Sequence, residues 1–263
     1  MQNETTLRLV VFLGLFIVLA LVEQLAPRRP RQYQARRWLT NWMFIVVDTL
    51  TLRALAVVLP FVAVLAAVDA GQRGLGLFNL IDLPFWVELI LVILILDLAI
   101  WAQHVISHKI PLLWRFHRVH HADVEIDVTT AIRFHPVEIA LSMAFKIGLV
   151  YILGPAAWAV IIFEVILNGS AMFNHANIKL PLPLDALIRR VLVTPDMHRI
   201  HHSTIRAEHD TNYGFALSWW DRLFGTYTDQ PQDGQVDMKI GLQWQDTRPT
   251  GLIWSLALPF FRR

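Results

Sequence analysis

The chain has 263 residues, of which 55% are hydrophobic and only 17% are charged, and its mean hydropathy is +0.46. This composition is too apolar for an ordinary soluble domain. The sequence contains no cysteine, which excludes disulfides, thiolate metal sites and cysteine nucleophiles, so any metal must be bound by nitrogen or oxygen. The formal net charge of +2 argues against a protein that binds nucleic acid.

The first apolar segment covers residues 7–26, about the 20 residues that a helix needs to cross a bilayer. A cluster of arginines follows it, which places that end in the cytoplasm and the N-terminus outside. A cleaved signal peptide would carry basic residues before the apolar segment, and residues 1–6 contain none. The clustered residues are Arg28, Arg29, Arg31, Arg36 and Arg37.

Two further apolar segments follow in the N-terminal half of the chain. Residues 42–68 are long enough to return outward, and residues 84–103 run inward again after a loop at residues 69–80. The third helix therefore delivers His104 and His108 to the cytoplasmic end.

Two apolar arms, residues 139–153 and 156–167, flank Gly154-Pro155 and predict a helical hairpin that spans or re-enters the membrane. The remaining residues, 168–263, are mixed polar and aromatic, and should lie on the cytoplasmic side. The expected fold class is all-α integral membrane, with about three N-terminal transmembrane helices, a membrane hairpin and a cytoplasmic helical cap. No linker or internal repeat divides the chain, so we expect one structural unit.

All 11 histidines lie between His104 and His209, and three clusters of them stand at helical spacing. A single histidine on a helix is usually an ordinary polar residue. Three buried clusters would instead cost desolvation and mutual repulsion unless shared cations used their neutral ring nitrogens. Imidazole suits iron, zinc, copper and nickel, and eight nitrogens exceed the four of a tetrahedral zinc, so two metals are predicted. The clusters are His104 and His108; His117, His120 and His121; and His198, His201 and His202.

Other residues near the clusters are candidates for the same site. His175 directly follows the predicted hairpin and is a ninth candidate ligand. Three roles are open for His135: a further metal ligand, a residue that supports the ligands or faces the substrate, or a cap of the helix that follows Pro136. His209 lies in a polar run and is expected to be a solvated surface histidine. Three nearby acids, Glu138, Glu164 and Asp196, could orient imidazole N–H groups. A tenth ligand, or a residue that supports the ligands, could come from His135, Glu138, Asp196 or Asn212.

The motifs resemble the fatty acid hydroxylase / sterol desaturase superfamily, whose pattern is HxxxH, HxxHH and a second HxxHH around a membrane hairpin. Here the three motifs occur in the same order. Other stretches also look like this family, and the similar regions together cover about residues 84–228. These stretches are Arg133-Phe134-His135-Pro136-Val137-Glu138, the run from Asp210 to Gly214, and the run from Trp220 to Tyr227.

The resemblance implies a di-iron centre, two iron ions that activate O2, with electrons from a separate protein of ferredoxin or cytochrome b5 type. The chain has no fused cytochrome b5 domain and no flavin or nicotinamide fingerprint. Some relatives have a second histidine one helical turn after the position of His175, where this chain has Lys179, so His135 or water could complete the ligand set. The ligands carried over by position are His104, His108, His117, His120, His121, His175, His198, His201 and His202.

The resemblance also implies hydroxylation or desaturation of a lipid-like substrate, such as a fatty acyl chain or a sterol. An alcohol, an alkene and a cleaved ether would share one ligand set. The expected division is residues 1–83 for the N-terminal transmembrane helices, 84–228 for the catalytic domain and 229–263 for a C-terminal tail. The metal site should lie on the cytoplasmic face of a bacterial inner membrane, or of the endoplasmic reticulum membrane in a eukaryote.

An apolar substrate is expected to enter from the bilayer between helices. Aromatic residues of the tail would form a lid or, more simply, anchor the cap at the headgroup level. A divalent-metal transporter is an alternative, but it needs polar ligands within the spans, and the apolar arms contain almost none. A di-zinc membrane hydrolase is another, although such sites normally mix carboxylate with imidazole. The aromatic residues are Trp219, Trp220, Phe224 and Tyr227.

Overall fold

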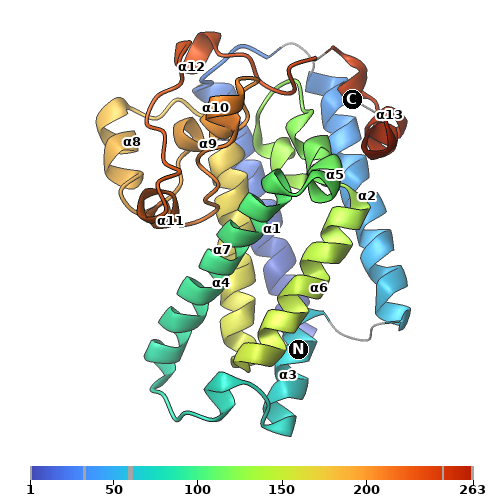
Figure 1. Ribbon diagram of the computed structural model, residues 1–263, viewed down its shortest axis with the longest axis vertical. Helices are drawn as coiled ribbons and strands as arrows, with labels where there is room; N and C mark the ends of the chain where they lie inside the picture. The colour runs from blue at the N-terminus through green and yellow to red at the C-terminus, as the bar shows by residue number, and fades with distance from the viewer. Residues whose placement is uncertain (1, 32–33, 59–61, 245, 262–263) are drawn as a thin grey trace.

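The computed structural model describes residues 2–31, 34–58, 62–244 and 246–261, and the regular elements among them are all helical (Figure 1). Long helices form a stem, and short helices form a cap at the end where the C-terminus lies. The stem contains α1 (Gln2–Leu25), α2 (Gln34–Val58), α3 (Ala63–Arg73), α4 (Phe85–Lys109), α6 (Pro136–Leu153) and α7 (Ala157–His175), with η1 (Leu77–Asn79) at its far end. The cap contains α5 (Pro111–His121), η2 (Val128–Ile132), α8 (Leu182–Ile188), α9 (Pro195–His201), α10 (Arg206–His209), α11 (Trp219–Leu223), α12 (Gly234–Asp237), η3 (Arg248–Thr250), α13 (Leu252–Ala257) and η4 (Leu258–Phe260).

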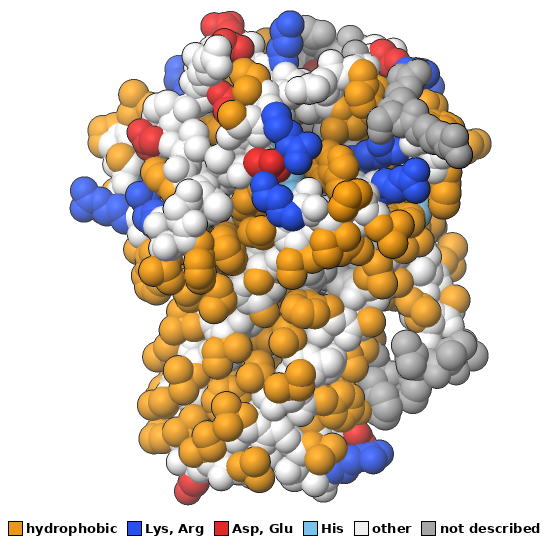
Figure 2. All heavy atoms as spheres, viewed as in Figure 1, with side chains coloured by type: hydrophobic (Ala, Val, Ile, Leu, Met, Phe, Trp, Pro, Cys, Tyr) orange, Lys and Arg blue, Asp and Glu red, His pale blue; other side chains and the backbone are white. Residues whose placement is uncertain are grey.

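Four stem helices are long and apolar enough to cross a membrane, which fits the predicted all-α membrane fold with a hairpin. Figure 2 shows hydrophobic side chains over most of the stem, whereas charged side chains gather on the cap and at the far tip. Such a continuous apolar surface marks a membrane-facing region. The four segments are Thr6–Leu25, Phe85–Lys109, Pro136–Leu153 and Ala157–His175.

The predicted second span, residues 42–68, is not one helix in the structure. α2 and α3 are separate helices, and neither is among the four apolar ones. Pro60 lies between them in the sequence, and proline has no N–H group with which to continue a helix. α2 also carries Asp48 and Arg53, and charged side chains make a complete crossing costly.

The hairpin between α6 and α7 turns at Gly154, whose φ of +61° is a conformation that favours glycine. The loop that precedes α4 crosses this turn closely. A Cβ atom on Gly154 would lie 2.2 Å from the Leu75 carbonyl oxygen, and one on Gly76 would lie 2.2 Å from the Gly154 nitrogen. Asn79 Nδ2 donates to the Gly154 carbonyl at 3.0 Å. The two glycines thus allow the far end of the stem to close.

The core of the stem aligns the two helices that end at the histidines. Val92 and Leu96 of α4 and Phe163 of α7 are buried in one apolar cluster. α7 continues beyond the predicted end at residue 167, so His175 is its last helical residue and does not follow the hairpin on a loop.

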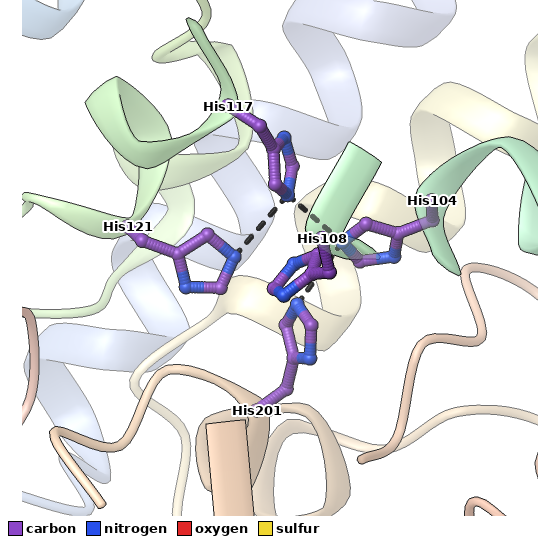
Figure 3. A group of neighbouring side chains, drawn as sticks. All are labelled: His104, His108, His117, His121 and His201. Carbon is purple, nitrogen blue, oxygen red and sulfur yellow. Dashed lines mark hydrogen bonds between the residues drawn. The ribbon is translucent and has the colours of Figure 1, made fainter. Parts of the chain in front are cut away.

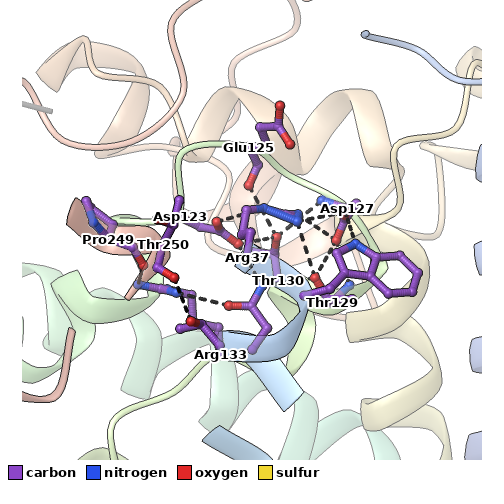
Figure 4. Close-up of polar contacts among 12 residues, drawn as sticks. Arg37, Asp123, Glu125, Asp127, Thr129, Thr130, Arg133, Pro249 and Thr250 are labelled. Atoms are coloured by element: carbon purple, nitrogen blue, oxygen red, sulfur yellow. Dashed lines mark hydrogen bonds and ion pairs between the residues drawn. The ribbon is translucent and has the colours of Figure 1, made fainter. Parts of the chain in front are cut away.

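A buried ion-pair network joins the stem to the cap (Figure 4). Arg37 of α2 is fully buried, and its guanidinium group lies 3.0 Å from Asp123 Oδ1 and 2.7 Å from Asp127 Oδ1. Asp127 also caps η2 by accepting a hydrogen bond from the Thr129 N–H. Because a buried charge must be paired, this network fixes η2 against α2.

Arg133 extends the network to the C-terminal residues. Its guanidinium group donates to Asn41 Oδ1 at 3.0 Å, to the Val119 carbonyl at 2.9 Å and to the Pro249 carbonyl at 3.0 Å. Burial lowers the pKa of Arg133 to about 10. The side chain therefore connects α2, α5 and the segment that leads into α13, and it stands two residues before His135.

Three of the five arginines that predicted a cytoplasmic loop form ion pairs, two with residues of the cap and one with the end of α1. Arg28 lies 2.9 Å from Asp196, and Arg31 lies 3.1 Å from Glu23. Arg37 belongs to the buried network described above. These three residues therefore stabilise the junction between the stem and the cap, in addition to any effect on membrane orientation.

Candidate metal centre

The nine histidines that the sequence singles out as ligands are all buried, and they fall into two groups. The ligand nitrogens of each group lie within 4.8 Å of one another. Figure 3 shows the rings of the larger group pointing toward a common centre. The larger group contains His104, His108, His117, His121 and His201, and the smaller group contains His120, His175, His198 and His202.

Each HxxHH motif contributes to both groups. On α5, His117 and His121 are one turn apart and face the larger group, whereas His120 faces the smaller one. In the second motif, His201 joins the larger group, while its neighbour His202 lies in the smaller one. α5 and α9 therefore lie between the two groups, and a single short helix supplies ligands to both.

The hydrogen bonds of the larger group fix the tautomers of its rings. His104 Nδ1 lies 2.7 Å from the Tyr213 carbonyl oxygen, and His201 Nδ1 lies 2.7 Å from the Thr211 carbonyl oxygen. A carbonyl can only accept, so both Nδ1 atoms carry the proton and both Nε2 atoms present a lone pair. These two Nε2 atoms are 3.0 Å apart. Two lone pairs repel at this distance unless a cation lies between them.

His117 belongs to the same arrangement through a carboxylate. Its Nδ1 lies 2.6 Å from Glu138 Oε1, and its Nε2 lies 3.0 Å from His104 Nε2. A carboxylate behind a metal-binding imidazole fixes the ring and raises its basicity. The prediction that Glu138 orients an imidazole thus agrees with the geometry.

In the smaller group, backbone carbonyls accept hydrogen bonds from the outer ring nitrogens. His175 Nδ1 lies 2.7 Å from the Ala171 carbonyl, His120 Nδ1 lies 3.2 Å from the Arg133 carbonyl, and the two Nε2 atoms are 3.1 Å apart. Both ring nitrogens of His108 and of His202 are buried without a hydrogen-bond partner. Buried polar atoms are rarely left unsatisfied, so the donor set of both groups fits bound metal ions.

The cap histidines are also tuned toward the neutral form that binds metals. Burial and the neighbouring imidazoles lower the pKa of His198, His201 and His202 well below the ordinary value, because both disfavour the charged ring. The same causes lower the pKa of His120 and His121. These nitrogens are therefore available as lone-pair donors at neutral pH.

The other candidates take different positions. His135 caps α6, since its Nδ1 accepts the Val137 N–H at 3.2 Å, and it belongs to neither group. Asp196 pairs with Arg28 and with Arg199, and Asn212 Nδ2 donates to the Met197 carbonyl at 2.9 Å. Glu164 pairs with residues of the stem, so it does not orient an imidazole. Among these candidates, Glu138 contacts a ring through its side chain, and Asn212 contacts the His198 ring through its backbone.

The prediction for His209 was wrong, because this residue is buried. Its ring centroid lies 4.8 Å from that of His108, 4.7 Å from that of His121 and 4.7 Å from that of Trp114. The polar run around it, which suggested a solvated loop, forms the short helix α10 over the larger group. Burial lowers the pKa of His209 to about 4. Its Asp210 neighbour lies 3.7 Å from His108 Nδ1.

Asp221 supports the site from a position that sequence reasoning left unassigned. Its carboxylate accepts hydrogen bonds from the Tyr213 N–H at 2.9 Å, the Gly214 N–H at 2.8 Å and Trp101 Nε1 at 3.0 Å. This holds the Tyr213 carbonyl that orients His104. Asp221 lies in the family-like run from Trp220 to Tyr227, so the sequence did mark this stretch. The motif does not reveal that the carboxylate supports the backbone at Tyr213.

The aromatic residues between Trp219 and Tyr227 contact the stem. Trp220 Nε1 donates to Asp97 Oδ2 at 2.8 Å, and Phe224 stacks on Trp101 with ring centroids 4.6 Å apart. Trp219 and Phe224 are 43% and 53% exposed. These exposed rings lie at the base of the cap, as expected for anchors at a membrane interface.

Two cavities approach the larger group from the stem. One of about 180 Å³, here called the metal-side cavity, lies between α4, α6 and α7 and is lined by His104, His117 and Glu138. The other, of about 240 Å³, shares Glu138 with it and is otherwise mainly apolar, with Phe116 and Phe145 in its wall. A third cavity of about 300 Å³ opens at His209 on the cap.

Replacing Glu138 by Gln should weaken metal binding about 10- to 100-fold, because the carboxylate that fixes His117 becomes a neutral amide. Metal content after dialysis against graded chelator concentrations would measure this. Asp246→Asn, which changes an exposed carboxylate paired with Arg248, is the matched control. Equal metal retention in both variants would contradict the role of Glu138.

The metal-free protein should lose stability as the pH falls through about 6.5. In the folded chain the pKa values of His198, His201 and His202 lie well below this ordinary value, so the unfolded chain binds more protons. The contribution of these three histidines to the free energy of unfolding is therefore present above pH 6.5 and is lost as the pH falls. Melting temperatures of chelator-treated protein in detergent across this range would test the sign, and a melting temperature that rises toward acid pH would contradict it.

Comparison with known proteins gives several related enzymes. The chain is 30% identical to an ornithine lipid hydroxylase of Rhizobium tropici over 68% of this chain and 52% of that protein. It is 28% identical to the alkylglycerol monooxygenase of Homo sapiens over 50% of this chain and 28% of that protein. The cholesterol 25-hydroxylase of Rattus norvegicus is 26% identical over 57% of this chain and 49% of that protein. The chain thus spans about half the length of these relatives or less.

No solved structure matches the chain. The model of the fatty acid hydroxylase family matches residues 89–226, which is more than half of the chain. This region contains all nine histidines of the two groups, together with Glu138 and Asp221. The chain therefore belongs to the fatty acid hydroxylase family.

Proposed function

We propose that this protein is an oxidative membrane enzyme, a non-haem di-iron oxygenase that uses O2 to hydroxylate a lipid-like substrate. The observation that carries the proposal is the pair of histidine groups beside a cavity between apolar stem helices. Two bound irons would supply the activation of O2 there. The nine histidines would hold them, and Glu138 would fix the His117 ring.

The donor set supports iron over zinc. The Nε2 atom of His104 lies 3.0 Å from that of His117 and 3.0 Å from that of His201, so three imidazole nitrogens converge on one position. Five imidazoles also exceed the four ligands of a tetrahedral zinc. This argues against the di-zinc hydrolase.

The ligand positions also argue against a metal transporter. A transporter needs polar ligands along its membrane path. Here both groups lie at the cap end of α4 and α7, and the far end of the stem is closed by the packing of Gly76 against Gly154. The metals would therefore remain bound in place.

The metal-side cavity supports an apolar substrate that arrives from the bilayer. Its walls come from three helices that are apolar enough to span a membrane. Burying a lipid chain gains roughly 0.8 kcal/mol per CH2 group, and the same walls keep water away from the reacting carbon. Ile139 of α6 and Leu167 of α7 are among the apolar residues that line it.

The relatives favour hydroxylation over desaturation, because their names describe hydroxylases and monooxygenases. We further propose that electrons come from a separate ferredoxin- or cytochrome b5-type protein. The catalytic unit would be residues 84–228, with residues 1–83 as the membrane anchor and 229–263 as a supporting tail. The site would face the cytoplasm.

Replacing His202 by Ala should abolish oxidation and release metal, because it removes an imidazole whose two nitrogens have no other partner. The test combines iron analysis of the protein purified in detergent with lipid profiles of cells that contain the wild type or the variant. His135→Ala is the control, since it removes a helix cap at a cost of about 1 kcal/mol and should keep the iron. Bound zinc without iron in active wild-type protein would overturn the proposal.

Replacing Ile139 by Trp should shift the oxidised lipids toward shorter or less bulky chains while the metals stay bound. The larger ring would fill part of the 180 Å³ cavity on the substrate side. Ile152→Trp is the matched control, because Ile152 is 69% exposed on the bilayer-facing surface of the same helix. The product distribution, measured by lipid mass spectrometry, should change in the first variant alone.

A further inference from the structure

Lys146 is a charged residue on the wall of the metal-side cavity, and it lies in the mainly apolar helix α6. Its side chain is only 12% exposed, and its Nζ lies 2.7 Å from Glu164 Oε1 on α7. Ionisable side chains inside membrane helices are costly, and where they persist they commonly mark a functional path.

The ion pair with Glu164 does not by itself explain why Lys146 is present. Glu164 Oε2 also lies 2.5 Å from Arg8 Nη2 of α1, so this carboxylate has a second cationic partner. An apolar residue at position 146 would leave the pair between α1 and α7 in place. The lysine is thus the member of the trio that faces the cavity.

Other polar residues line the cavity on the side of Lys146 that leads to the histidines. Ser142 lies one turn before it on α6 and contacts Gln103 Oε1 at 3.4 Å, and Asn168 of α7 lines the same space. An ammonium group has three N–H donors, and Glu164 accepts one of them. The others can reach an acceptor that enters the cavity.

We propose that Lys146 binds an oxygen-bearing group of the substrate, a carboxylate or a carbonyl, and thereby sets which carbon of the chain lies at the histidines. This inference rests on the proposed function and names its substrate class: a chain lipid with an oxygen acceptor near the middle of the stem. Lys146 and Glu138 are eight residues apart on α6, which corresponds to about 12 Å of helix. Lys146 is therefore a positioning residue and does not touch the reacting carbon.

Binding of palmitate, methyl palmitate and hexadecane to the full-length, metal-loaded protein in nanodiscs would test this inference. Lys146→Met keeps the length of the side chain and removes its charge. It should weaken palmitate binding on the order of tenfold or more, because a hydrogen bond to a charged group is lost, and should leave hexadecane binding unchanged. Lys146→Arg should bind palmitate like the wild type. Methyl palmitate separates a carbonyl from a carboxylate as the acceptor.

Lys179→Met, which changes an exposed lysine outside the cavity, is the control. Should Lys146→Met fail to fold, Lys146→Gln keeps a donor to Glu164 and should show the same loss. Unchanged palmitate binding in a folded, metal-loaded Lys146 variant overturns the inference. Selective loss of palmitate binding supports it even where no oxidised product forms, and in that case the proposed function alone fails.

Discussion

The burial of converging imidazole nitrogens is the constraint on which the rest of the structure depends. In the pairs His104–His117, His104–His201 and His120–His175, both Nδ1 atoms are engaged on the outside, so lone pairs face each other at 3.0–3.1 Å. Such an arrangement is unfavourable without positive charge at its centre. Folding of the cap and metal binding are therefore expected to be coupled, because the unfolded chain has no preformed site.

The residues that hydrogen-bond the histidine rings, and those that hold these residues in place, account for much of the structure of the cap. The Tyr213 and Thr211 carbonyls orient one ring each, and Asp221 fixes the first of them through two backbone N–H groups. Arg133 holds the segment whose carbonyl orients His120, and it is itself bonded to three parts of the chain. The His104 and His120 rings are thus each positioned by a backbone carbonyl in a segment that a buried side chain holds.

The stem combines an apolar outer surface with charged side chains between its helices. Its outer surface is apolar, and its far end closes by the close approach of two glycines. Its interior nevertheless contains Arg8, Lys146 and Glu164, joined by ion pairs that link α1, α6 and α7. Lys146 is the member of this trio that lines the metal-side cavity, which is the basis for the proposal that it binds a polar group of an otherwise apolar molecule.

The sequence alone predicted the membrane class and the hairpin, and it singled out the nine histidines that the structure gathers into two groups, because hydropathy and helical spacing are local properties of the chain. It did not determine which histidine serves which group, since His120 and His121 are adjacent in sequence and face opposite ways. The burial of His209 and the role of Asp221 were likewise decided by tertiary packing. Each depends on residues distant in the chain, and local patterns carry no record of such contacts.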